Sequence, residues 1–404
     1  RMSGVRARLS APNKGFTMKE LRGFSVVKGN RDLKQITKTS GWHNYYADGS
    51  REMDLQMGGS AYTLGYNNPA VVKDLEKNIL EIARCQSNNG NFTDATSEAG
   101  VFVCGDVWDS FAWALSGTSA VEAAISMSDE YWKQMGKNKS KIISFSFAWH
   151  GTSYLTKDIG APFLLQNHTG RVINIDHPKG RSSEIDAINK ILFHTDLSEV
   201  GCIIFDSATW INGLYSWSEK WWQDIRNICD THDILMITDD VASGWGKSCS
   251  YYPFETFGYG IQPDISAVGK SLTAGYAPMG AALCNKKVGD VIQTKGAWNY
   301  NHTWQPSMVG IYLMLNVKQY IEERSLMDNS KIIARKLDDF GKELVKLGHI
   351  DRYRSNGLFL VLDCNDNNRK SGLSSKNKLR ICAPLIADET YFQDLKEHID
   401  ECFA

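Results

Sequence analysis

Residues 263–280 read PDISAVGKSLTAGYAPMG, and this stretch decides the fold. The apolar run 265–268 has the length of a buried strand and ends in Gly269-Lys270. Upstream, the apolar run 234–237 leads to Asp239-Asp240-Val241. A lysine and a carboxylate, each at the end of a buried strand, are the two groups that pyridoxal phosphate needs. The lysine holds the aldehyde as a Schiff base, and the carboxylate holds the pyridine nitrogen.

The same pattern recurs between residues 110 and 285. Each apolar run of strand length ends in a polar or special residue, and a helix-like segment usually follows; the runs are 111–115, 142–145, 202–205, 234–237, 265–268 and 279–284. Continuous apolar strands that alternate with helices predict an α/β fold with a mainly parallel sheet covered by helices. Ligands bind at the carboxyl ends of such strands, so the polar residues there should converge on one crevice.

The flanking segments differ from this core. Towards the N-terminus, the sequence predicts a hairpin at 42–55 with a type I′ turn at Asp48-Gly49, a loop at 58–69 and a helix at 70–86. Beyond residue 305 it predicts helices at 308–323, 330–347 and 389–402, strands at 357–363 and 379–381, and an exposed loop at 365–378. We therefore expect an N-terminal segment at 1–57, a large domain at 58–305 and a small C-terminal α+β domain at 306–404.

The composition excludes several classes of protein. Of the 404 residues, 42% are hydrophobic and 23% are charged, as in soluble globular proteins. The net charge of −1 argues against a nucleic-acid partner, and no apolar stretch is long enough to span a membrane. The nine cysteines, without a C-x-x-C pair, predict reduced thiols in a cytoplasmic protein. The nine histidines lack zinc-site spacing, so we expect no metal.

Two further stretches could hold the two ends of such a cofactor. Ser116-Gly117-Thr118 opens an expected helix, where backbone N–H groups and hydroxyls can bind an anion, although the motif alone also fits a simple helix cap. Trp149 and Val241 could lie on the two faces of the ring, although a core position is the default for any one of twelve tryptophans.

The acid and the amine have alternative readings as well. Asp239 alone could cap the next segment, and most lysines lie on the surface. A buried Asp239 needs a cationic partner, which a protonated ring nitrogen supplies. Burial of Lys270 would lower the pKa of its amine and free it for Schiff-base formation and proton transfer.

Together these residues resemble the class III aminotransferases of the fold-type I pyridoxal phosphate group. This family includes ornithine, 4-aminobutyrate and diaminopelargonate aminotransferases and glutamate-1-semialdehyde aminomutase. The resemblance runs from about Trp42 to Phe403 and is most specific over residues 235–282. There the acidic pair, the glycine turn at 244–246, Gly269-Lys270 and the motif G-Y-x-P-x-G at 275–280 have the family spacing.

The resemblance implies a role for each matching residue. Lys270 would be the catalytic Schiff-base lysine, and the cofactor would be held by Asp239, Val241, Trp149, Ser116, Gly117 and Thr118. Thr303 matches a threonine that reaches the phosphate of the other subunit, which implies a homodimer with shared active sites and an N-terminal segment near the dimer interface. Arg380 matches an arginine that often binds a substrate carboxylate.

The substrate side departs from the family pattern. Most members have Glu-Pro and a glycine-rich acidic loop where this chain has DSATW at 206–210. The loops around Trp42, Tyr62 and Trp210 are expected to shape the substrate pocket. The predicted substrate residues are therefore Arg380, Asp206, Tyr62 and Trp42, and the sequence leaves the amino donor and acceptor open.

We therefore predict a pyridoxal phosphate-dependent aminotransferase that acts on an amine or amino acid and a keto or aldehyde acceptor. An aminomutase of the glutamate-1-semialdehyde type would use the same residues but keep the amine on one molecule. A related decarboxylase, a racemase or a non-catalytic homologue are further alternatives. Intact Lys270 and Asp239 argue against the last of these.

Overall fold

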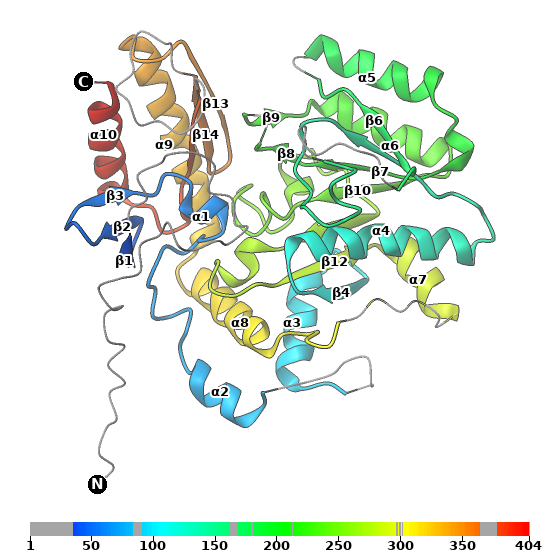
Figure 1. Ribbon diagram of the computed structural model, residues 1–404, viewed down its shortest axis with the longest axis horizontal. Coiled ribbons are helices and arrows are strands. Elements are labelled where there is room, and N and C mark those ends of the chain that lie inside the picture. The colour runs from blue at the N-terminus through cyan, green and yellow to red at the C-terminus, as the bar shows by residue number, and fades with distance from the viewer. Residues whose placement is uncertain are drawn as a thin grey trace, which may run out of the picture.

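The computed structural model describes residues 35–83, 91–160, 169–178, 181–211, 213–295, 298, 300, 302–363 and 378–403. Within these ranges, an α/β body and a smaller body of sheet and helices lie side by side (Figure 1). The expected loop at 365–378 falls almost wholly outside the described residues; only Lys378 is described, and it begins a strand.

A seven-stranded sheet forms the centre of the larger body. Its order is β4-β12-β11-β10-β7-β5-β6. The strands are β4 (Ser110–Ala114), β5 (Lys141–Phe145), β6 (Val172–Ile175), β7 (Val200–Asp206), β10 (Leu235–Asp239), β11 (Ile265–Val268) and β12 (Gly280–Cys284). Neighbours from β6 to β11 pair in parallel, and β12 is antiparallel to both of its neighbours. The predicted α/β fold with a mainly parallel sheet is therefore confirmed.

Helices cover both faces of this sheet. They are α3 (Asp94–Cys104), α4 (Gly117–Gln134), α5 (Arg181–His194), α6 (Glu219–Thr231), α7 (Lys286–Lys295) and α8 (Met308–Glu323). Successive residues of β10 enter different cores: Leu235 and Ile237 pack with the α4 side, and Met236 packs with Trp221 and Trp222 of α6. Burial on both faces explains why these strands are apolar throughout.

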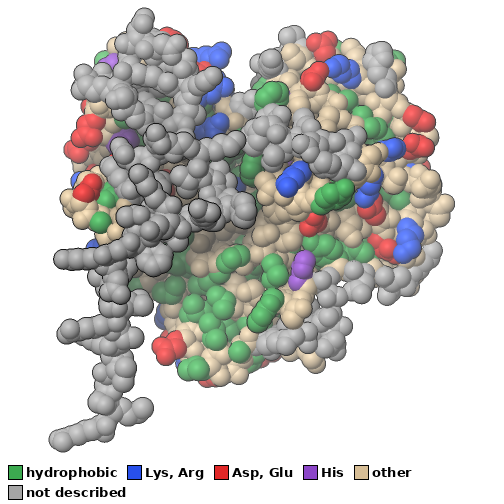
Figure 2. Space-filling model, in the orientation of Figure 1, with side chains coloured by type: hydrophobic (Ala, Val, Ile, Leu, Met, Phe, Trp, Pro, Cys, Tyr) green, Lys and Arg blue, Asp and Glu red, His purple; other side chains and the backbone are tan. Residues whose placement is uncertain are grey.

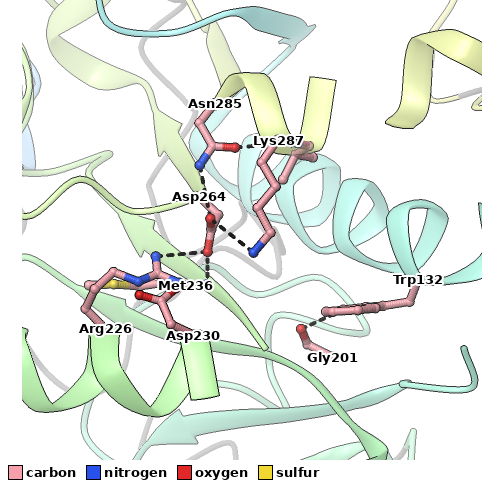
Figure 3. Close-up of polar contacts among 9 residues, drawn as sticks. Trp132, Gly201, Arg226, Asp230, Met236, Asp264, Asn285 and Lys287 are labelled. Atoms are coloured by element: carbon pink, nitrogen blue, oxygen red, sulfur yellow. Dashed lines mark hydrogen bonds and ion pairs between the residues drawn. The ribbon is translucent and has the colours of Figure 1, made fainter. Parts of the chain in front are cut away.

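Asp264 joins several elements at the amino end of β11. Its Oδ2 accepts hydrogen bonds from the backbone N–H of Met236 (2.9 Å) and the guanidinium of Arg226 (3.0 Å), and its Oδ1 accepts one from Asn285 (3.0 Å) (Figure 3). These partners belong to β10, α6 and the start of α7. The buried carboxylate therefore fixes β11 at the end opposite Lys270.

Replacing Asp264 with alanine should lower the free energy of unfolding by about 3–5 kcal/mol, because Arg226 would lose its buried partner. Urea denaturation followed by tryptophan fluorescence measures this loss. Asp290→Ala is the control, since Asp290 is exposed and forms an ion pair with Lys286 one helical turn away. It should change stability by less than about 1 kcal/mol. Equal effects of the two substitutions would show that the Asp264 contacts do not stabilise the fold.

The smaller body combines the two ends of the chain. Its strands are β1 (Ile36–Ser40), β2 (His43–Tyr46) and β3 (Arg51–Met53) in one antiparallel sheet, and β13 (Arg352–Asn356), β14 (Phe359–Asp363) and β15 (Lys378–Cys382) in another. Its helices are α9 (Leu326–Lys346) and α10 (Glu389–Phe403). One core contains Met53, Leu337, Leu360 and Leu395. In this shared core the N-terminal segment packs on the C-terminal strands and helices, while the first turns of α8, beyond residue 305, pack in the core of the larger body. The division at residues 57 and 305 stays a proposal.

The hairpin turn differs from its prediction. Strands β2 and β3 pair as expected, but only Gly49 has a positive φ, of 85°. A type I′ turn would need a positive φ at Asp48 as well. Instead, the Asp48 carboxylate accepts a hydrogen bond from the N–H of Ser50 (2.8 Å). The side chain thus stabilises the turn without a left-handed backbone at that residue.

The helix expected at 70–86 is also shorter than predicted. The structure has α2 only at Leu75–Glu81, and Asp74 before it has a φ of 54°. A left-handed residue ends any helical path from residues 70–73 into α2. Residues 70–74 instead form turns. Val71 in these turns is buried in the core shared by the two ends of the chain.

Candidate active site

A cavity of about 360 Å³ lies beyond the carboxyl ends of β4, β7, β10 and β11. It brings together most of the residues predicted from the sequence: Lys270, Asp239, Val241, Trp149, Ser116, Gly117, Thr118, Asp206 and Arg380. The convergence expected from a parallel sheet therefore occurs in the structure. Gln56, Gly59, His150, Gly151, Trp210, Ile211 and Ala242 complete the lining, and the sequence did not single out most of these.

Both oxygens of the Asp239 carboxylate are fixed. Oδ2 lies 2.7 Å from Nδ1 of His150, and Oδ1 accepts a hydrogen bond from the N–H of Val241 (3.1 Å). Burial by itself would lower the pKa of His150, but the hydrogen bond and charge of Asp239, with Asp206 nearby, raise it above its usual value. A buried acid therefore has a hydrogen-bonded imidazole on one side and faces the cavity on the other.

Lys270 lies in a strained turn directly after β11. Its φ is 41°, in the left-handed region that side chains rarely adopt, and the short helix η5 (Lys270–Thr273) begins with it. Burial lowers the pKa of its amine, and the nearby Lys247 lowers it further, against the opposing charge of Asp239. The amine is thus shifted towards the neutral, nucleophilic form. Strain of this kind persists where the surrounding structure fixes it, and it is common at active sites.

The N-terminus of α4 lines one part of the cavity with Ser116, Gly117 and Thr118. The Ser116 hydroxyl caps the helix by accepting the N–H of Ser119 (3.2 Å). The N–H groups of Gly117 and Thr118 follow it in the first turn, where no helical carbonyl is available to them. A Cβ at Gly151 would lie 2.4 Å from Oγ1 of Thr118, so the two loops approach closely here. Such a helix start binds phosphate well.

Val241 forms a floor between two glycines. A Cβ at Gly117 would lie only 2.5 Å from Cγ1 of Val241, and one at Gly269 would lie 3.3 Å from the same atom. Position 117 therefore needs glycine for Val241 to keep its place, whereas a side chain at position 269 would require Val241 to move by only a few tenths of an ångström. Trp149 lines the same cavity and is 41% exposed, so its ring is accessible to a bound molecule.

Gly117→Ala should therefore weaken cofactor binding by at least about tenfold, because the new methyl group displaces Val241. Titration of cofactor-free protein with pyridoxal phosphate, followed by tryptophan fluorescence, measures the affinity. Gly117→Ala combined with Val241→Ala removes the clash and should therefore bind the cofactor about as well as Val241→Ala alone, and more tightly than Gly117→Ala. A double variant as weak as Gly117→Ala would contradict the proposed contact.

The structure leaves three predicted residues outside the lining of this cavity. Trp42 donates a hydrogen bond to Asp394 (2.7 Å) and packs against Tyr391 in the smaller body. The Tyr62 ring packs against Tyr66, with centroids 4.4 Å apart. Thr303 is exposed on the surface. The rings of Trp42 and Tyr62 are thus used in packing outside the lining of the cavity.

Arg380 and the segment 206–211 form another part of the cavity lining. Arg380 donates a hydrogen bond to the carbonyl of Ile211 (2.7 Å), and Trp210 packs on Phe359 at 4.7 Å between centroids. Burial raises the pKa of Asp206 to about 6, and the charge of nearby His150 only partly opposes this. This part of the lining therefore combines one arginine with apolar walls.

A family model described as Aminotransferase class-III matches residues 26–397. The chain belongs to the class III aminotransferases. Acetylornithine aminotransferase of Aquifex aeolicus is 26% identical over 382 residues, which are 92% of this chain and 95% of that protein. Gamma aminobutyrate transaminase 3 of Solanum lycopersicum is 22% identical and covers 88% of this chain and 73% of its own length.

Solved structures agree with this class III aminotransferase in fold. A pyridoxal phosphate-bound amine transaminase from an uncultivated Pseudomonas species has a TM-score of 0.84 at 20% identity and covers 95% of this chain and 97% of its own. An (S)-enantioselective omega-transaminase from Thermomicrobium roseum has a TM-score of 0.82 at 17% identity, with 91% and 92% covered. The predicted fold-type I architecture, aminotransferase activity and pyridoxal phosphate cofactor are thereby confirmed.

The cavity of this class III aminotransferase fits pyridoxal phosphate. The buried Asp239–His150 pair suits a ring nitrogen, the glycine-flanked Val241 suits a flat ring, and the start of α4 suits a phosphate. Among the described residues, no three His, Cys, Asp or Glu side chains group as a metal site. No described helix is both long and apolar enough to cross a membrane.

Proposed function

We propose that this aminotransferase uses Lys270 as its catalytic lysine and Asp239 as the partner of the cofactor ring nitrogen. The observation that carries the proposal is that the amine and the fixed, buried carboxylate line one cavity at the ends of neighbouring strands. Val241, Trp149, Ser116, Gly117 and Thr118 would hold the ring and phosphate.

The chain's own groups then have distinct tasks. Bound pyridoxal phosphate supplies an electron sink that makes the α-hydrogen of an amine substrate acidic. Lys270 anchors the cofactor until the substrate amine displaces it. Its lowered pKa then lets the freed amine accept the proton from the substrate carbon and deliver it to the cofactor carbon. Asp239, oriented by His150, keeps the ring nitrogen protonated.

A substrate with a carboxylate and an apolar body fits the part of the cavity around Arg380 best. Arg380 presents a guanidinium to the cavity and is held by a backbone carbonyl, not by an acid, on the Ile211 side. Trp149, Trp210 and Ile211 supply apolar walls beside it. Asp206 is more deeply buried than Arg380. We therefore propose that its carboxyl group mainly sets the polarity of the site beside His150, and that direct substrate binding is the lesser role.

Arg380→Ala should lower kcat/KM for amines that carry a carboxylate by about 10- to 100-fold, the value of a lost charge-assisted hydrogen bond. For neutral aryl-alkyl amines, kcat/KM should fall by less than about threefold in the same variant. Initial rates with both kinds of donor measure the difference. Arg324→Ala, at a surface arginine that lies over Tyr320, is the control. Equal losses for both donors would contradict carboxylate binding by Arg380.

The general activity is tested with a panel of amine donors and keto or aldehyde acceptors. A transaminase releases a keto product from the donor in the absence of acceptor and leaves the cofactor as pyridoxamine phosphate. An aminomutase would instead convert one substrate without release of a separate product. Failure of every donor to convert bound cofactor would contradict the proposed transamination.

We also propose a homodimer in which Thr303 approaches the phosphate site of the partner subunit. Large apolar side chains are exposed on α2, on α3 and next to Thr303: Leu80 (80%), Val101 (74%) and Trp304 (72%). Figure 2 shows hydrophobic side chains gathered on the face that carries α8. An exposed apolar area of this kind is typical of an interface. Light scattering should give twice the chain mass; a stable monomer with full activity would contradict the proposal.

A cytoplasmic location is our inference for the compartment. It is supported by the odd number of cysteines and by the free thiols of the cysteines that the structure describes. Localisation of a tagged chain by cell fractionation tests it.

A further inference from the structure

One wall of the cavity is a left-handed turn. Gln56 and Gly59 line the cavity, and the residues of α1 (Met57–Ser60) all have positive φ angles: 46° at Met57, 61° and 69° at the two glycines, and 67° at Ser60. For Met57 and Ser60 this conformation is unfavourable by about 1–2 kcal/mol each. Contacts from the surrounding structure must therefore hold the turn.

Lys247 makes the contact at the end of this turn. Its side chain is fully buried, and its Nζ donates a hydrogen bond to the backbone carbonyl of Ser60. Its own carbonyl accepts the N–H of Leu358, which lies next to β14 of the smaller body (2.8 Å). Lys247 thus connects the wall of the cavity, the turn that follows β10, and the C-terminal domain.

The same wall also touches the turn that carries Lys270. Three residues after Ser60, the Thr63 hydroxyl donates to the hydroxyl of Ser271 (2.7 Å), the residue after Lys270. Near the start of the wall, Leu55 accepts the N–H of Cys382 in β15 (2.7 Å). A displacement at Ser60 would therefore reach both Lys270 and the strand that carries Arg380.

Lys247 has an unusual electrostatic setting. It forms no ion pair with a carboxylate in the described ranges, and its titratable neighbour is the buried thiol of Cys382, with Asp54 and Tyr391 beyond that thiol. Burial lowers the pKa of Lys247, because an unpaired buried ammonium is costly. When two buried amines interact in one site, as we propose for Lys247 and Lys270, they titrate as a coupled pair.

The titratable groups around Lys270 have opposite effects on the pKa of its amine. Asp239 from β10, Asp206 from β7 and the Cys382 thiol from β15 favour a proton on Lys270, and Lys247 opposes it. Lys247 is thus the one group among these four that promotes the neutral amine. A second cation near a reactive lysine is a known way to activate it.

We propose that Lys247 is a positioning residue of this site, which clasps the 57–60 turn and thereby holds, through Thr63 and Ser271, the turn that carries Lys270. The proposal rests on the proposed role of Lys270 as the reactive lysine. Under this proposal the turn after β10 has two roles: it places Asp239 and Val241, and through Lys247 it holds the 57–60 turn. Lys247 itself does not line the cavity and acts through its neighbours.

The test uses cofactor-free protein. Trace acetylation with acetic anhydride across a pH series, read by mass spectrometry, gives the pH midpoint at which the Lys270 amine becomes reactive. Lys247→Met and Lys247→Gln should raise this midpoint by about one pH unit, a tenfold change in proton affinity. Hydrogen exchange of the amides at 57–63 should accelerate at least about tenfold in both variants.

Lys139→Met is the matched control, because Lys139 is another buried lysine that donates to backbone carbonyls, those of Leu197, Val200 and His232. It should leave the Lys270 midpoint and the 57–63 amides unchanged. Lys247→Arg keeps the charge, so its midpoint should be no higher than that of the unaltered protein.

Four outcomes would overturn the proposal. They are unchanged exchange of the 57–63 amides in folded Lys247→Gln, an unchanged midpoint in the same variant, a raised midpoint in Lys247→Arg, and an equal shift in Lys139→Met. If both neutral variants fail to fold, the Lys247→Arg result decides. The proposed function itself is tested by a separate experiment, borohydride reduction of the unaltered protein with bound cofactor. If Lys270 is not the reactive lysine, no cofactor will be attached to it after reduction, whatever the acetylation midpoints are.

Discussion

Lys270→Ala is expected to lower the rate of transamination by about 10⁴-fold or more while the fold is kept. The substitution removes two functions at once, the anchor of the cofactor and the base that moves the proton. Because Lys270 lies in a turn at the cavity and not in a packed core, alanine should leave the sheet intact. Single-turnover rates with a good amine donor measure the loss.

Two controls make this prediction sharp. Lys286→Ala removes an exposed lysine that forms an ion pair with Asp290, so the rate of this variant should be unchanged within about twofold. Added small primary amines should restore part of the proton transfer in Lys270→Ala, because they can supply a base in the vacated space. A Lys270→Ala protein with more than a tenth of the original rate would contradict the assigned role.

Asp239→Asn should give the second largest loss, about 10²- to 10⁴-fold in kcat/KM. The amide keeps the shape of the side chain but removes the charge that a protonated ring nitrogen needs. It also removes the charge that raises the pKa of His150, so that pKa should fall. Cofactor affinity should fall together with the rate, and titration of the cofactor-free protein reports it.

Asp240→Asn is the matched control for this prediction. Asp240 is equally buried and adjacent, but its carboxylate accepts hydrogen bonds from Ser207 (2.5 Å), Ser266 (2.7 Å) and Thr238 (2.8 Å) and does not line the cavity. Its loss should lower stability more than cofactor affinity. If the two variants bind the cofactor equally well, Asp239 is not the partner of the ring nitrogen.

The central sheet was predictable because its strands are buried on both faces. Such strands appear as short apolar runs, and each expected run has a strand at its position. Edge strand β6 was not predicted, since only its first and last residues are buried and its pattern is correspondingly mixed. The helix at 70–86 was predicted too long, because apolar spacing does not report the left-handed backbone at Asp74.

The site was predictable where a residue follows a strand directly. Lys270, Asp239 and Ser116 follow β11, β10 and β4, or end them, so the topology alone brings them together. Gln56 and Ile211 reach the cavity from turns without periodicity, and nothing in their local sequence indicates it.

Side chains that act behind the cavity were harder still to predict. His150 has a signal that could have been used, since a buried Asp239 needs a donor, and a histidine beside Trp149 can provide one. The loop around Trp42 was expected to shape the substrate pocket. The indole of Trp42 contacts Asp394 and Tyr391 in the smaller body, and contacts between segments so far apart are not visible in the sequence.

The most direct test of the account is borohydride reduction of the purified protein with bound pyridoxal phosphate, followed by peptide mass spectrometry. We predict that the visible absorption band disappears and that the phosphopyridoxyl mass is found on the peptide containing Lys270. A reduced adduct on any other lysine, or a folded protein that binds the cofactor without such a band, would contradict the assignment of Lys270 as the catalytic residue.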